Sequence, residues 1–228
     1  MPMFNTKKVA NFYREFRLTI WLLLPSLVIQ IFAGDWHEWL RYQQLEVTQG
    51  QWWRLITANF CHSNWYHFGL NMLGLVMIDY FYQPVINHRW RFWLMWFCLL
   101  LNVILLHWLV DLSWYVGMSG ALHGYLIGGA LITYFQYKII NSLIIVIVTG
   151  KLFLEMVWDI NFTASELIEA NVVEESHLFG ALSAVFFYGL FRGYQYFSGH
   201  PISYSPDSPP ANPNAYHSDI EEKPGPHS

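Results

Sequence analysis

Charged residues are scarce in this chain of 228 residues: they make up 12 % of the sequence, against about a quarter in ordinary soluble domains. Apolar residues make up 54 %, and 12 Trp and 14 Tyr add rings that favour membrane–water interfaces. This composition excludes an ordinary soluble domain. The net charge is only −4, and no basic stripe interleaved with aromatic residues is present, so nucleic acid is not an expected partner.

Cysteine is sparse too, and a signal-peptide cleavage site is missing. Cys61 and Cys98 form neither a Cys-x-x-Cys motif nor a framework of spacings, so we interpret both as packing residues. Basic residues precede the apolar run from Leu18 to Ala33, as in a signal peptide. Its exit, Ile31-Phe32-Ala33-Gly34-Asp35, matches a small-x-small site poorly. We therefore interpret the run as a first retained membrane span.

Several apolar segments approach the ~20 residues that a helix needs to cross a hydrocarbon core of about 30 Å. The six segments are approximately Arg17–Ala33, Tyr66–Gln83, Phe92–Val110, Ser119–Tyr137, Ile139–Trp158 and His177–Tyr194. They predict an all-α membrane protein with a six-transmembrane-helix bundle over 17–197. Residues 1–16 form a predicted cytoplasmic N-terminal segment. The Pro-rich tail 198–228 cannot bury a core, and its composition predicts disorder.

Basic residues gather on one side of these segments. They precede the first segment, separate the second from the third (His88 to Arg91), and recur at Lys138 and Arg192. The other side carries acidic loops and a long aromatic loop over 34–65, which we place at the membrane interface. The positive-inside bias therefore predicts that both termini are cytoplasmic.

Polar side chains inside apolar segments are costly, so each needs a reason. His67 and Asn71 are four residues apart, which puts both on one helix face. They are either an interhelical hydrogen-bonding pair or two donors aimed at one point. Lys151 and Glu155 have the same spacing. We interpret them as an ion pair that is neutralised inside the bundle, with a functional role as the alternative.

The fourth segment opens with Gly117-Met118-Ser119-Gly120. A serine flanked by glycines at a helix start has an approachable hydroxyl, and the free N–H groups of a first helical turn stabilise a developing anion. The alternative is a simple turn with a capping serine. His123 follows one turn later on the same face, where it can pack against His177 or hydrogen-bond to it.

A stripe of small residues continues from this serine. Gly120, Gly124 and Gly128 recur every four residues, and such stripes let another helix approach closely. The last segment offers a matching face, formed by His177, Gly180, Ala181 and Ala184. Ser119 and His177 both stand at the outer edge of their segments, so contact between the two faces places His177 beside Ser119.

Histidine could also indicate a metal site. His62, His67, His123 and His177 do not match a His-Glu-x-x-His helix motif, and no carboxylate or Cys ligand lies close to them in the sequence. We predict no metal and no cofactor.

The polar residues resemble the motifs of rhomboid proteases, over about Trp53 to Gly193. Four motifs occur in the family's order, namely Trp53-Arg54, His62-x₄-His67-x₃-Asn71, Gly117-x-Ser119-Gly120 and His177-x-x-Gly180. The resemblance implies a six-helix rhomboid bundle and a Ser–His dyad without an acid, with Ser119 as nucleophile and His177 as base. It also implies an oxyanion site made by His67, Asn71 and the Ser119 backbone N–H, with Gly117, Gly120, His123 and His62 in support.

One position departs from many rhomboids, which carry a tyrosine four residues after the serine. Here that residue is His123, and the run Gly117-Met-Ser-Gly-Ala-Leu-His-Gly124 resembles the rhombosortase branch. The branch implies a bacterial inner-membrane enzyme with an active site near the outer face. Its substrates are exported proteins with Gly-Gly and a C-terminal transmembrane segment. The alternatives are a general rhomboid protease of single-span proteins and a non-catalytic rhomboid-like binder. A small transporter is a further alternative, but we find no paired inverted repeat.

Overall fold

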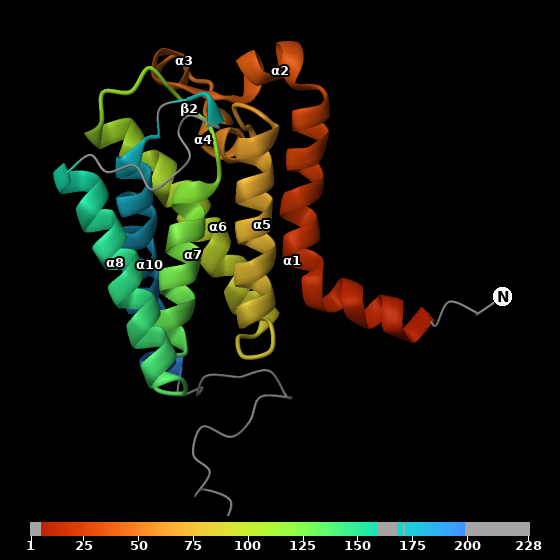
Figure 1. The fold of residues 1–228 in the computed structure, drawn as a ribbon, viewed down its shortest axis with the longest axis vertical. Coiled ribbons are helices and arrows are strands. Elements are labelled where there is room, and N and C mark those ends of the chain that lie inside the picture. Colours follow the sequence, from red (N-terminus) through yellow and green to blue (C-terminus); the bar gives the residue numbers. More distant parts are fainter. Residues whose placement is uncertain (1–5, 159–167, 171, 199–228) are drawn as a thin grey trace, which may run out of the picture.

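The computed structural model of the chain describes residues 6–158, 168–170 and 172–198 (Figure 1). Its long helices are α1 (Thr6–Ile31), α5 (Trp65–Tyr82), α6 (His88–Leu109), α7 (Ser119–Ile132), α8 (Lys138–Trp158) and α10 (Glu174–Ser198). Each predicted segment overlaps one of these helices, although the fourth was expected to reach Tyr137 and α7 ends at Ile132. Among the described residues, α6 and α8 are long and apolar enough to cross a membrane by themselves, so the six-span count stays a prediction. The predicted disordered tail lies almost entirely outside the described residues.

The prediction of an all-α fold agrees with a structure that is almost entirely helical, and the first long helix extends beyond the first predicted segment. α1 begins at Thr6 rather than near Arg17, and Figure 1 shows its first turns bending away from the bundle. Two short strands, β1 (Tyr42–Gln43) and β2 (Trp114–Tyr115), pair antiparallel. They join two loops that are far apart in the sequence, and so fix the chain that leads into α7.

The predicted interfacial loop folds into short helices around Arg54. These are α2 (Ala33–Leu40), α3 (Gln44–Thr48), α4 (Arg54–Thr57) and the 3₁₀ helix η1 (Ala58–Phe60). The buried Arg54 guanidinium donates to the carbonyls of Glu38 and Arg41, both at 2.7 Å, and to Gln51 Oε1 at 2.8 Å. A planar fork of donors suits several acceptors at once, so this arginine holds the loop together.

α7 lies at the centre of the bundle and packs against α5, α6, α8 and α10. Its closest neighbour is α10, where the backbone of Gly180 meets the backbone of Gly120. A Cβ added at Gly124 would lie 2.5 Å from the Gly180 carbonyl oxygen. At Gly128 the nearest atoms to an added Cβ belong to Leu94 of α6, so the stripe of glycines admits two neighbouring helices.

Arg91, which the sequence analysis counted among the basic residues between two segments, forms a buried ion pair inside the bundle. Arg91 lies inside α6, is 2 % exposed and forms an ion pair with Asp79 of α5. Tyr125 of α7 and Thr19 of α1 donate to the same carboxylate at 2.7 and 2.6 Å. Arg91 is therefore a structural charge that ties helices together, and it does not belong to a loop.

Candidate active site

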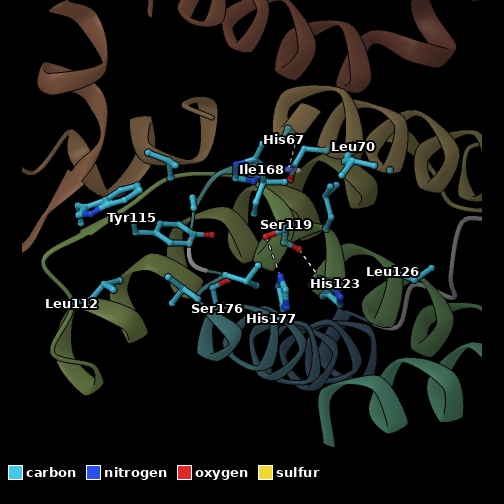
Figure 2. A pocket seen from close by; sticks show the side chains of 18 of the residues that line it. His67, Leu70, Leu112, Tyr115, Ser119, His123, Leu126, Ile168, Ser176 and His177 are labelled. Carbon is cyan, nitrogen blue, oxygen red and sulfur yellow. Dashed lines mark hydrogen bonds between the residues drawn. The ribbon is translucent and has the colours of Figure 1, made fainter. Parts of the chain in front are cut away.

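Ser119 is the first residue of α7, and His177 lies in the first turn of α10. The hydroxyl of Ser119 and Nε2 of His177 are 3.1 Å apart, within hydrogen-bonding distance (Figure 2). The preceding Gly117 has a φ of +109°, a backbone conformation that residues with a side chain rarely adopt. This turn brings the chain abruptly into α7, so that the serine faces α10.

Contacts between glycine backbones make this approach possible. A Cβ at Gly120 would lie 2.5 Å from both the Ser176 carbonyl oxygen and Asn102 Nδ2. Gly180 of α10, one turn after His177, has no room for a Cβ against the Gly120 backbone. The two helices are therefore in contact immediately below the serine and the histidine, which fixes the distance between them.

The second nitrogen of His177 also has a partner. Nδ1 lies 3.1 Å from Oε2 of Glu155 on α8, and Oε1 of the same carboxylate forms an ion pair of 2.6 Å with Lys151. The side chains of His177 and Glu155 are 2 % and 0 % exposed. The ion pair of Lys151 and Glu155 agrees with our interpretation of the sequence, but the contact with His177 was not anticipated.

His123 supports this arrangement from within α7. Its ring is stacked on that of His177, with centroids 4.2 Å apart, and its Nδ1 lies 2.8 Å from the backbone oxygen of Ser119. Figure 2 shows both histidines reaching toward the serine from their separate helices. Of the two contacts that the sequence left open, packing against His177 is the one observed.

His67 and Asn71 lie on the facing side, on α5. Ser63 contacts Nδ1 of His67, with its hydroxyl at 3.1 Å, so the opposite edge of the ring faces Gly117. Asn71 Nδ2 donates to the His67 carbonyl at 2.9 Å, and both residues line the same cavity as Ser119. His62 is fully buried behind this layer and packs edge-on against His67, with ring centroids 5.1 Å apart. It supports His67 and does not line the cavity.

A cavity of about 380 Å³ opens over the serine. It extends between α5 and α7 to Ile78 and Leu126, and the segment around Ile168 borders it near Ser119 (Figure 2). Ser63 Oγ donates to the Ile168 carbonyl at 2.6 Å, which links this segment to the wall formed by α5. The surface of the cavity is mainly apolar, and its polar groups lie near Ser119, as in many small-molecule and peptide sites.

Sequence reasoning missed two residues beside the serine. Tyr115 of β2 lines the cavity and donates to the Gly117 carbonyl at 2.9 Å. Burial raises the pKa of its phenol above the ordinary value, so the hydroxyl stays neutral and can donate. Ser176 lines the cavity next to His177. The sequence could have indicated Ser176, which is adjacent to His177. It could not have indicated Tyr115, which reaches the site through the β1–β2 pairing.

The fold and the site together define a helical bundle with a serine and a histidine in contact at one end. A family model, the Rhomboid domain, matches residues 49–194, and the chain therefore belongs to the rhomboid family. Rhomboids are generally intramembrane serine proteases, which act on membrane proteins within the bilayer. Searches of curated proteins and of solved structures found no match.

Proposed function

We propose that this chain is an intramembrane serine protease in which Ser119 is the nucleophile and His177 its general base. The observation that carries the proposal is the 3.1 Å contact between Ser119 Oγ and His177 Nε2 beside a cavity. A hydroxyl is a weak nucleophile until a base takes its proton, and a base must lie within hydrogen-bonding reach to do so.

The proposed reaction passes through an acyl-enzyme. Ser119 Oγ attacks the carbonyl carbon of the scissile peptide while its proton moves to His177 Nε2. His177 then returns that proton to the leaving amine as the C–N bond breaks. Water, deprotonated by the same nitrogen, attacks the acyl carbon; the bond between that carbon and Ser119 Oγ then breaks, His177 returns the proton to Oγ, and the new carboxyl end is released.

The negative oxygen of each tetrahedral intermediate needs hydrogen-bond donors. We assign this role to the Ser119 backbone N–H, at the start of α7, and to His67 and Asn71 across the cavity. The positive end of the α7 dipole adds to the stabilisation. Loss of a single such donor costs ~10²–10³ in rate in other serine proteases.

An active-site probe tests the mechanism directly. A fluorophosphonate should label the wild-type protein in membranes, and Ser119→Ala should remove both the label and the cleavage of a reporter substrate while expression continues. Undiminished cleavage by Ser119→Ala would eliminate Ser119 as nucleophile. A wild-type protein that neither labels nor cleaves would favour the non-catalytic rhomboid-like binder.

We further propose the rhombosortase class of substrate, namely exported proteins anchored by a C-terminal transmembrane segment. A membrane helix keeps its backbone hydrogen-bonded, yet a scissile bond must be extended before attack. Glycine is ~0.8–1.0 kcal/mol poorer than alanine in a helix, so Gly-Gly at the outer end of an anchor unwinds readily. The motif that supports this choice is Gly117 to Gly124, with His123 in place of tyrosine.

Deletion of the gene tests the substrate class. Intact-mass measurement should show that proteins with a Gly-Gly anchor keep their C-terminal segment in the deletion strain. If those proteins remain processed, the enzyme is a general rhomboid protease of other single-span proteins. We place it in a bacterial inner membrane with its site near the outer face, where exported proteins are accessible.

A further inference from the structure

Glu155 is an acidic side chain inside the apolar helix α8, and it belongs to no motif that the sequence shares with rhomboids. Its carboxylate is fully buried, with one oxygen 2.6 Å from Lys151 Nζ and the other 3.1 Å from His177 Nδ1. α8 ends at the same end of the bundle at which α7 and α10 begin (Figure 1). The carboxylate therefore lies behind the base, at the depth of the nucleophile.

The contact determines which nitrogen of His177 carries the proton. An ionised carboxylate can only accept hydrogen bonds, so Nδ1 must donate to Glu155. In a neutral imidazole, Nε2 is then unprotonated and accepts the Ser119 hydroxyl. This is the tautomer that a general base for Ser119 requires.

The same carboxylate stabilises the charge that forms during the reaction. When His177 takes the serine proton, the ring becomes positive among Ser119, His123 and the more distant Lys151. The positive charge of Lys151 disfavours that charge, and Glu155 is the carboxylate in contact with the ring. Lys151 is 26 % exposed at its side chain and keeps Glu155 ionised by offsetting part of its burial cost.

We propose that Glu155 is a positioning residue for His177, so that Ser119, His177 and Glu155 act as a triad within the membrane. The inference rests on the proposed function and deepens it, because the dyad that the family resemblance implies has no acid. Glu155 acts through His177: it fixes the ring, sets its tautomer and stabilises its protonated form.

The rival explanation is that Glu155 only neutralises Lys151. Two variants distinguish these roles. Glu155→Gln removes the carboxylate but leaves Lys151 unpaired, which can destabilise the bundle for a reason unrelated to His177. The double variant Lys151→Met/Glu155→Gln removes both charges, so the bundle no longer contains an unpaired ion. Glu175→Gln, which removes a carboxylate two residues before His177, is the matched control.

The kinetic prediction concerns kcat measured on purified, folded protein in proteoliposomes. The double variant should keep the wild-type KM and thermal midpoint while its kcat falls by up to about 10⁴-fold, the loss that follows removal of the orienting acid in other serine proteases. Glu175→Gln should stay near wild type. A double variant with kcat within about threefold of wild type overturns the proposal, because the carboxylate then served only Lys151.

A second measurement needs no change at Glu155. Solid-state NMR of ¹⁵N-histidine-labelled wild-type protein at neutral pH should show His177 protonated at Nδ1, the resonance being assigned by its loss in His177→Ala. A proton on Nε2 instead would contradict the proposal even if every Glu155 variant failed to fold.

The cleavage activity of Ser119→Ala, measured in parallel, separates the triad proposal from the proposed function: if this variant stays active, the proposed function fails. If it is inactive while the double variant is fully active, only the triad fails.

Discussion

The rings of His123 and His177 are stacked, with their centroids 4.2 Å apart and 27° between their planes, although the residues lie on different helices. His123 also contacts the Ser119 carbonyl through Nδ1, so one side chain touches both members of the reactive pair. We expect His123→Ala to lower kcat by between about 10- and 100-fold, because the base loses the surface that orients it. His123→Phe retains a ring and should lose less. Equal losses in the two variants would show that the Nδ1 contact matters more than stacking.

Removing the base should be as damaging as removing the nucleophile. We expect His177→Ala to lose about as much kcat as Ser119→Ala, and the double variant to be little worse than either, because the two groups act as a unit. Single-turnover cleavage of a fluorogenic single-span substrate measures all three. Losses that multiply in the double variant would assign His177 a role independent of Ser119.

The contact between Gly120 and Gly180 should make the bundle intolerant of a single methyl group. Gly180→Ala introduces a Cβ where the Gly120 backbone already lies, and we expect a loss of ~1–3 kcal/mol in stability together with most of the activity. Gly189 lies on the same helix with nothing within 4 Å of an added Cβ, so Gly189→Ala should be neutral or slightly stabilising. Thermal unfolding in detergent compares them, and equal effects would refute the close-approach explanation.

The basic residues predict that both termini are cytoplasmic, and the correction at Arg91 leaves that prediction in place. Lys138 and Arg192 still lie on one side, together with the basic residues that precede the apolar part of α1. A tag after Ser228 should resist protease added to intact spheroplasts and become sensitive once they are lysed. Cleavage of the tag before lysis would reverse the proposed orientation and move the site to the inner face.

Hydrophobic run length predicted the positions of the long helices, because burial in an apolar phase acts on each segment separately. It could not indicate the first turns of α1, which are helical although they contain Lys7, Lys8 and Arg14, because no apolar run is present there. It also failed at Arg91, because a charge inside a helix is tolerated once a partner such as Asp79 lies opposite. The sequence around Arg91 does not indicate that Asp79 is its partner, and the sequence around Asp79 does not indicate Arg91.

The residues that meet at Ser119 could be predicted where they share a depth or a helix face. Ser119 and His177 lie in the first turns of their helices at the same end of the bundle, and His123 follows Ser119 by one turn. Glu155 and Tyr115 could not be predicted to reach the site. The rotation of α8 about its axis decides whether Glu155 faces Lys151 alone or also His177, and a four-residue spacing leaves that rotation open.

α7 contains 14 residues, so it rises only about 21 Å along its axis. A bilayer has a hydrocarbon thickness of about 30 Å, which leaves a mismatch of about 9 Å between the helix and its surroundings. A bundle that places Ile132 at one boundary of the hydrocarbon thus holds Ser119 below the headgroups at the opposite boundary. Lipid does not fill this gap, because α7 is enclosed by α5, α6, α8 and α10, of which α6 and α8 are long enough to cross a bilayer. The short central helix therefore sets the serine back from the membrane surface while longer helices stand beside it, so a scissile bond has to enter the recess between those helices to reach the serine.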